Sequence, residues 1–187
     1  MNEYSARQIE IMDIAVDLIS AKGIQQLTIK NLSAAVGVTE GAIYRHFTSK
    51  KQILFGLLER FQISQTENFK MISKSGLNPV EQIHLVYTKR FQQFSARPAL
   101  ASAIFSEEIF QNDATLAELV SKIMSQNQRA ITRIINNGQQ TNAIRDDISA
   151  DQLAMVIMGL LRLIITRWRV NGFKFNLIKE GEKLWYT

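Results

Sequence analysis

Apolar side chains recur along this chain at intervals of three and four residues, and no convincing run alternates at every second residue. The first period is typical of helices that turn one face toward a core, whereas the second is typical of strands. At the N-terminus Ile9, Met12 and Val16 follow the helical period, and Lys22-Gly23 breaks it. We therefore expect a first helix over about residues 4–21 in an all-α protein.

Two short apolar-periodic segments follow, joined at a tight turn around Gly37. Thr28 is placed to cap the first segment and Thr39 the second, because a threonine oxygen accepts hydrogen bonds from the backbone N–H groups that begin a helix. Ile43 and Phe47 turn inward on the second segment, which leaves a short outer side rich in donors. This is the layout of a helix-turn-helix that reads DNA.

Capping residues and helix breakers divide the rest of the chain into longer helices. The expected helices cover about residues 50–73, 79–96, 98–108, 113–138, 149–171 and 176–185. The sequence thus predicts about nine helices without repeats or a long linker. We assign residues 1–48 to an N-terminal three-helix helix-turn-helix DNA-binding domain and residues 49–187 to a C-terminal helical bundle for effector binding and dimerisation.

The charge distribution supports DNA binding locally rather than globally. The net charge is +5, yet residues 1–50 hold five bases and five acids. From Lys22 to Lys51 there are five bases and one acid, so positive charge is concentrated on the predicted reading segment. An anionic effector, solvated faces or ion pairs explain the surplus bases of the body equally well, and these bases include Arg129, Arg133, Arg162, Arg167 and Arg169.

Few residues are suited to catalysis or metal binding. The chain has no Cys and two His. His84 follows Glu81 at the spacing of a di-iron ligand pair, but such a site needs a second pair, so a half-buried, hydrogen-bonded His84 is the better interpretation. No Gly-rich phosphate loop or nucleophile elbow is present. We expect no enzymatic activity, no metal and no cofactor.

The chain lacks the sequence pattern of an exported or membrane-spanning protein. Acidic residues occupy the N-terminus where a signal peptide needs bases, and the most apolar run, residues 153–165, is shorter than the about 20 residues that cross a bilayer. The absence of cysteine fits a reducing compartment. A cytoplasmic location is therefore expected.

Residues 37–54, GVTEGAIYRHFTSKKQIL, resemble the signature of the TetR family of bacterial transcriptional regulators. Ala15, Lys22-Gly23 and Leu27-Thr28 are similar in spacing, so the match covers about the first 55 residues, and the remainder is similar only in length and helix order. The resemblance implies a homodimeric repressor that leaves its operator DNA when a small-molecule effector binds. Operator, effector and the sign of regulation stay open.

The predicted DNA contacts combine physical reasoning with this resemblance. Gly41 and Ala42 are small enough to let the helix approach bases, and Arg45 can reach guanine or a phosphate. Tyr44, His46 and Lys50 resemble the family's phosphate-contacting positions. The complete predicted set is Thr28, Lys30, Thr39, Glu40, Gly41, Ala42, Tyr44, Arg45, His46 and Lys50.

The resemblance also suggests an effector pocket and a dimer interface in the body. Six residues are candidates for the pocket lining, although aromatic stripes at helical spacing also form ordinary core: Tyr87, Phe91, Phe105, Met124, Gln128 and Trp168. Nine apolar residues are candidates for the interface, although they can also fill an intrachain core: Leu153, Val156, Ile157, Leu160, Leu161, Ile164, Leu177, Ile178 and Trp185.

Two alternative functions belong to other classes. One is a DNA-binding architectural or division-control protein without an effector, and the other is a helical carrier of lipids or small molecules. Stabilisation of the protein by a small molecule would argue against the architectural or division-control protein. Protection of a promoter in nuclease footprinting would argue against the carrier.

Overall fold

The computed structural model of the protein describes residues 4–106, 111 and 113–185. In these ranges all regular elements are helices, nine α-helices and one short 3-10 helix, which confirms the predicted all-α fold. They form two compact units: residues 1–61 with 98–120, and residues 62–97 with 121–187. None of the helices in the described part is long and apolar enough to cross a membrane.

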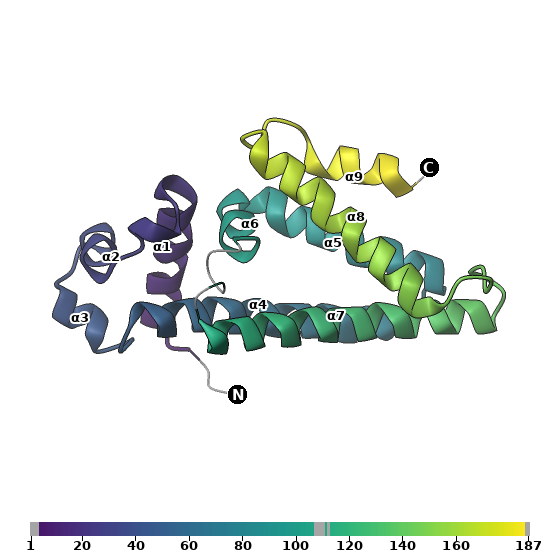
Figure 1. The fold of residues 1–187 in the computed structure, drawn as a ribbon, viewed down its shortest axis with the longest axis horizontal. Coiled ribbons are helices and arrows are strands. Elements are labelled where there is room, and N and C mark those ends of the chain that lie inside the picture. The colour runs from purple at the N-terminus through teal and green to yellow at the C-terminus, as the bar shows by residue number, and fades with distance from the viewer. Residues whose placement is uncertain (1–3, 107–110, 112, 186–187) are drawn as a thin grey trace. The chain divides into compact units, whose positions relative to one another are not determined.

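The first unit is built on a three-helix head. It contains α1 (Ala6–Lys22), η1 (Ile24–Gln26), α2 (Ile29–Val36), α3 (Glu40–Tyr44), α6 (Pro98–Ile104) and the first parts of α4 (Lys50–Ser73) and α7 (Ala114–Gln140). Figure 1 shows α2 and α3 beside α1. Met12, Leu32 and Ile43 are fully buried, so the three helices of the head share a core. The removal of this apolar surface from water stabilises the arrangement.

A capping box sets where α1 begins. The Ser5 hydroxyl accepts a hydrogen bond from the Gln8 backbone N–H at 3.2 Å, and the Gln8 side chain accepts one from the Ser5 N–H at 3.0 Å. This reciprocal pair satisfies two backbone donors at the helix start, so α1 begins at Ala6 rather than at Tyr4. Tyr4 lies just before the helix and donates a hydrogen bond from its hydroxyl to Glu59 at 2.6 Å.

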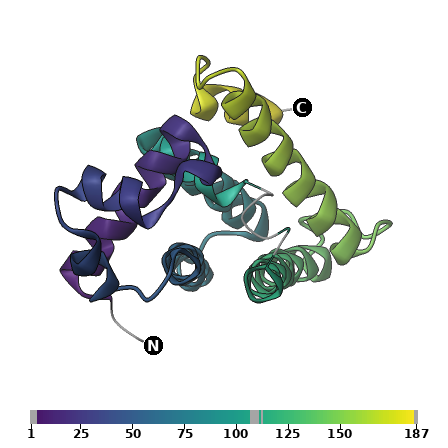
Figure 2. The ribbon, with the colours of Figure 1, turned by 60° about the vertical axis from the view of Figure 1, so that its left-hand side comes forward.

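The second unit is a bundle in which α9 (Leu177–Trp185) packs against α5 (Pro79–Ala96) and α8 (Ala150–Val170). It also contains the second parts of α4 and α7, which Figures 1 and 2 show running side by side. One core cluster joins α5, α7 and α8 through Ile83, Ile131, Ile135, Ala150 and Ala154. The small side chains of Ala150 and Ala154 let α8 pack closely against the isoleucines of α5 and α7.

Two expected helix ends are wrong. The helix from Ala114 was expected to stop at Gly138, but it continues to Gln140. Gly138 is buried, and a Cβ at this position would lie 2.5 Å from Ile144 Cδ1, so the glycine serves close packing instead of ending the helix. The other helix, α6, ends at Ile104 before the expected Glu108, which lies outside the described residues.

Candidate DNA-reading surface and effector-binding region

The helix-turn-helix has the predicted caps and turn. The Thr28 hydroxyl oxygen accepts a hydrogen bond from the Asn31 backbone N–H at 3.1 Å, and Thr39 accepts one from the Ala42 N–H at 3.3 Å. Gly37 adopts a left-handed conformation with φ 78°, which residues with a side chain rarely take. The Val38 N–H then bonds back to the Ser33 carbonyl at 2.9 Å and closes the turn between α2 and α3.

The inner side of the reading segment is fixed by burial. Ile43 and Phe47 are almost completely buried. The Gln8 side chain donates a hydrogen bond to the His46 backbone carbonyl at 3.1 Å, which ties α1 to the end of α3. The reading segment is therefore held from within while its opposite side faces solvent.

The second helix of the helix-turn-helix, α3, is only five residues long. It ends at Tyr44, and the N–H groups of His46 and Phe47 both bond to the Ile43 carbonyl, at 2.9 and 3.0 Å. This shared acceptor tightens the last turn and allows Phe47 to enter the core. Arg45 caps the helix instead of lying within it. Tyr44, with 52% of its surface exposed, and Arg45 nonetheless face solvent.

The other predicted DNA-binding residues lie on the same run of elements. Thr28, Lys30, Glu40 and Gly41 are exposed, and Ala42 is half-buried. Lys50 has an additional internal role, because its Nζ donates a hydrogen bond to the Ile24 carbonyl at 2.9 Å. Partial burial lowers the pKa of this amine. Lys50 thus joins the start of α4 to η1.

Salt bridges occupy two acidic residues of α1. Asp13 lies 3.0 Å from Arg60, and Glu10 lies 2.7 Å from Arg7. Both pairs are partly exposed, so each contributes at most about 1 kcal/mol to stability. Each pair also neutralises an acidic charge on the surface of α1.

In the second unit, Tyr87 and Phe91 line a cavity of about 240 Å³ formed by α5, α8 and α9. The Tyr87 hydroxyl donates a hydrogen bond to the Ile157 carbonyl, and burial raises the pKa of this phenol above its ordinary value. Gly181 also lines the cavity and lies directly against the Phe91 ring. Apolar side chains thus line much of the cavity, together with the polar groups of His84, Tyr87, Thr88 and Glu182.

His84 lines the same cavity and is half-buried, as expected, but its partner is remote in the sequence. Its Nε2 lies 3.0 Å from the Glu182 carboxylate on α9, and its ring stacks on Trp185 with 4.7 Å between centroids. Glu81 instead caps α5 by accepting a hydrogen bond from the Asn78 N–H at 3.0 Å. Glu81 and His84 thus have separate structural roles, a helix cap and a contact with α9.

The structure does not bring the six predicted effector residues together. Trp168 is buried, donates its Nε1–H to the Phe175 carbonyl at 2.8 Å and packs its ring against Phe173. Met124 is 49% exposed and Gln128 is half-buried. Phe105 belongs to the other unit. Of the six, Tyr87 and Phe91 alone share the cavity between α5, α8 and α9.

The predicted interface residues fall into three groups by exposure. Val156 and Leu160 are exposed on α8, whereas Ile164 and Leu177 are buried within the chain. The third group is half-buried: Leu153, Ile157, Leu161, Ile178 and Trp185. Leu153, Ile157 and Trp185 pack against the core cluster of the unit.

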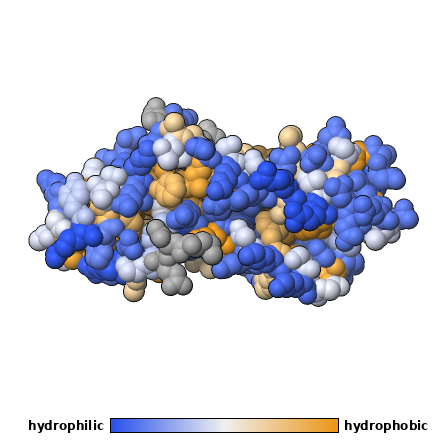
Figure 3. Space-filling model, turned by 90° about the horizontal axis from the view of Figure 1, so that it is seen from below, coloured by the Kyte–Doolittle hydropathy of each residue, from blue (hydrophilic) through white to orange (hydrophobic). Residues whose placement is uncertain are grey.

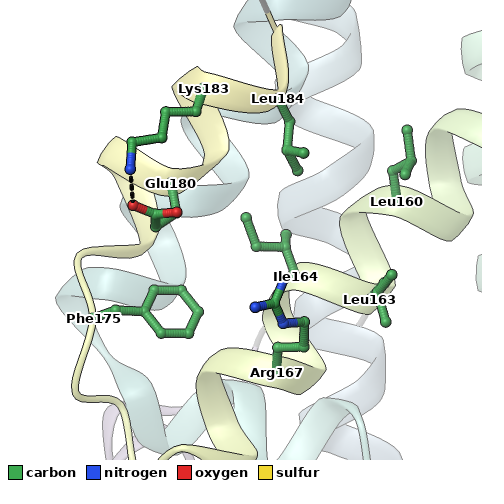
Figure 4. A pocket seen from close by; sticks show the side chains of 8 residues that line it. All are labelled: Leu160, Leu163, Ile164, Arg167, Phe175, Glu180, Lys183 and Leu184. Atoms are coloured by element: carbon green, nitrogen blue, oxygen red, sulfur yellow. Dashed lines mark hydrogen bonds and ion pairs between the residues drawn. The ribbon is translucent and has the colours of Figure 1, made fainter. Parts of the chain in front are cut away.

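Sequence reasoning missed four exposed apolar residues of α8 and α9: Met155, Leu163, Val170 and Leu184. The sequence could have indicated them, because apolar residues lie on several sides of α8, whereas a helix with one buried face needs only one apolar side. Beside them α8, α9 and the connecting loop enclose a cavity of about 280 Å³. Figure 4 shows the side chains of Leu163, Arg167 and Phe175 lining it, with the Lys183–Glu180 ion pair on α9.

Comparison with known families identifies the class of the protein. Residues 11–57 match the model of the bacterial regulatory proteins of the tetR family, and residues 58–186 match the C-terminal region of YsiA-like proteins. The chain therefore belongs to the TetR family. Members of this family bind operator DNA and small-molecule effectors, so the protein is a ligand-responsive transcriptional repressor.

Particular relatives share nearly the whole chain. The fatty acid metabolism regulator protein of Bacillus subtilis is 24% identical over 178 residues, covering 95% of this chain and 91% of the relative. The crystal structure of Bacillus subtilis FadR in complex with stearoyl-CoA is similar, with a TM-score of 0.80, 22% identity and 95% coverage of both chains. FadR from Bacillus halodurans has a TM-score of 0.85 at 19% identity, covering 99% of this chain and 95% of that one.

Proposed function

We propose that residues 1–48 bind double-stranded operator DNA through the outer side of α3. The observation that carries this proposal is the contrast between the two sides of the reading segment. Ile43 and Phe47 are buried, whereas Tyr44 and Arg45 are exposed and available to a ligand. Arg45 reads a base edge or a nearby phosphate, while Tyr44 and His46 position the protein on the backbone.

The repressor acts as a homodimer that uses the exposed apolar face of α8. Met155, Val156, Leu160 and Leu163 are between 44% and 65% exposed and recur at helical spacing. Exposed apolar patches of this kind favour association. Gly159 lies on the same helix, and a Cβ added there would meet no atom within 4 Å, so a partner helix can approach at this position. Two copies read two half-sites about one helical turn apart.

The effector is a long-chain acyl thioester whose tail occupies the cavity next to Tyr87 and Phe91. The cavity is lined mainly by apolar side chains of α5, α8 and α9. The relative solved with stearoyl-CoA supports this ligand class. Binding of the effector weakens operator binding, because it favours an arrangement of the dimer that fits the two half-sites less well.

Nuclease footprinting across the DNA upstream of the protein's own gene tests the DNA assignment. The wild-type protein should protect a segment with two related half-sites. The double variant Tyr44→Ala, Arg45→Ala should lose this protection while keeping its helical circular-dichroism spectrum, because both side chains are outside the core. Retained protection by the folded double variant would refute the assignment of α3 as the reading helix.

A further inference from the structure

One row of residues on α8 is exposed along most of the helix. Its members follow one another at intervals of four residues, so they are neighbours on a single ridge of the helix surface. They are Asp151, Met155, Gly159, Leu163 and Arg167, and all five are exposed. By contrast, the right-hand half of Figure 3, which views the second unit from the side of α4 and α7, shows hydrophobic surface only in patches among hydrophilic side chains.

The chemistry of this α8 ridge is self-complementary. Gly159 lies at its centre, Met155 and Leu163 lie four residues to either side, and Asp151 and Arg167 lie eight residues to either side. A second copy whose α8 runs antiparallel therefore places base opposite acid and apolar side chain opposite apolar side chain. A parallel pair would place each charge opposite itself, which is unfavourable.

Helix packing favours contact between two such ridges. Rows of residues four apart interdigitate when two helices cross at about −50°, the commonest class in globular proteins, with the axes about 8–10 Å apart. Gly159 has no side chain that would hold the helices apart, and a Cβ added there would meet no atom of its own chain within 4 Å. The two-fold axis of a symmetric dimer can therefore pass beside Gly159, where the two helices come closest.

A cavity borders one end of the α8 ridge. Leu163 and Arg167 line this cavity of about 280 Å³, which α9 and the loop before it complete. In the antiparallel pair the partner's Met155 lies opposite Leu163 and thus at this cavity, and an unbranched methionine side chain adapts to an irregular space. Leu160 and Leu184 line both this cavity and the one between α5, α8 and α9. A side chain seated here is therefore one residue layer away from the proposed effector cavity.

The charges at the two ends of the α8 ridge can pair between copies. Figure 4 shows the Arg167 guanidinium pointing into the α8/α9 cavity, where Glu180 is engaged with Lys183. Asp151 accepts a hydrogen bond from the Thr132 hydroxyl at 2.8 Å through one carboxylate oxygen. A carboxylate accepts at both of its oxygens, so Asp151 can also receive an arginine.

We propose that two copies pair through the α8 ridge in antiparallel orientation, so that the partner's Met155 fills the cavity beside Leu163 and the partner's Asp151 pairs with Arg167. The inference rests on the proposed homodimer and adds its register and a site that the partner completes. Two-fold symmetry repeats each contact, so one dimer contains two filled cavities and two ion pairs. The occupant of the α8/α9 cavity is thus a second copy of this chain.

Charge reversal with rescue tests the ion pair. Sedimentation equilibrium of the full-length protein gives the dimer Kd of the wild type, Asp151→Arg, Arg167→Asp and the double reversal. Each single reversal places like charges opposite each other and should raise the Kd at least about 10-fold. The double reversal restores opposite charges and should return the Kd to within about 3-fold of the wild type, because the pair is re-formed with its ends exchanged.

A matched control accounts for the change in net charge. Lys122→Asp makes the same change as Arg167→Asp at an exposed position of α7, away from the α8 ridge, and should leave the Kd within about 3-fold of the wild type. Circular dichroism verifies that each variant is folded. Single reversals that match this control, or a double reversal that stays as weak as the single reversals, would overturn the proposal.

Disulfide cross-linking reads the register directly, because the chain has no cysteine of its own. A disulfide needs Cα atoms less than about 7 Å apart, so it forms only between positions that face each other. The double variant Met155→Cys, Leu163→Cys should form a covalent dimer on mild oxidation, whereas each single variant should stay uncross-linked. Cross-linking of Met155→Cys alone, or none in the double variant, would overturn the antiparallel register.

The same measurements separate this inference from the proposed function. A wild type that stays monomeric at micromolar concentration would refute the proposed homodimer itself. A dimeric wild type whose Kd is insensitive to both charge reversals would leave the homodimer standing and show that the proposed register is wrong.

Discussion

Replacement of Gly181 by alanine tests how α9 is held in the bundle. Gly181 is buried on α9, where it packs against the Phe91 ring of α5. An added Cβ would lie 2.1 Å from Phe91 Cε2, which is about 1.4 Å inside the about 3.5 Å that two carbon atoms normally keep. Phe91 is only 2% exposed and lines the cavity between α5, α8 and α9, so its ring can relieve part of the overlap only by moving into that cavity.

The expected cost follows from this overlap. Overpacking a tightly filled site typically destabilises a protein by about 1–3 kcal/mol. Alanine is favoured over glycine within a helix by about 1 kcal/mol, which offsets part of this cost. The net loss is therefore up to about 2 kcal/mol, which corresponds to a decrease in Tm of up to about 4–8 °C for a chain of this size.

Denaturant unfolding followed by tryptophan fluorescence measures this effect directly. Trp168 and Trp185 both lie in the second unit, so the signal reports on the unit that contains α9. The matched control is Lys179→Ala at an exposed position of the same helix, which should change the stability by less than about 0.5 kcal/mol. Equal stability changes in the two variants would refute the packing argument.

A second substitution tests the specific contact. Phe91→Leu removes ring atoms that the new Cβ would meet. The double variant Phe91→Leu, Gly181→Ala should therefore be more stable than the sum of the two single changes predicts, by about 0.5–3 kcal/mol. Simple additivity would show that the two residues do not press on each other.

Three further predictions concern DNA binding, assembly and pH. Arg45→Ala should weaken specific operator binding, measured by fluorescence anisotropy, by about 1–3 kcal/mol and relax the base preference at one position of each half-site. An unchanged base preference would show that Arg45 does not read a base. Gly159→Arg should shift sedimentation toward the monomer at micromolar concentration while leaving the fold intact, and an unshifted dimer would place the interface elsewhere. Burial raises the pKa of Tyr87 above its ordinary value of 10.0, so the neutral phenol stabilises the fold below that pH and this stabilisation is lost as the pH rises above it. Tyr87→Phe should reduce the alkaline loss of stability that thermal unfolding measures. Identical pH profiles of stability for the wild type and the variant would contradict this role.

The features that could be predicted from the sequence are those set by local interactions. Thr28, Thr39 and Ser149 cap helices because their hydroxyls bond to backbone groups three residues away. Gly37 ends α2 because the turn needs a positive φ. Such requirements involve only neighbouring residues, so a single sequence reveals them.

The features that could not be predicted depend on contacts between remote segments. Gly138 resembles a helix stop, but its small size serves the packing of Ile144. His84 pairs with Glu182, which is 98 residues away, rather than with Glu81. Likewise, nothing in the sequence pairs the face of α4 that carries Lys70 with the face of α7 that carries Arg133. Helical periodicity identifies a face but does not say which other face it meets.

The central claim is that operator and effector binding are coupled in one dimer. Its most direct test is a reciprocal titration with labelled operator and palmitoyl-CoA. We predict that saturating palmitoyl-CoA weakens operator binding by about 5- to 150-fold and that saturating operator weakens palmitoyl-CoA binding by the same factor, because linked equilibria are reciprocal. An operator affinity that stays constant while palmitoyl-CoA demonstrably binds would contradict this coupling.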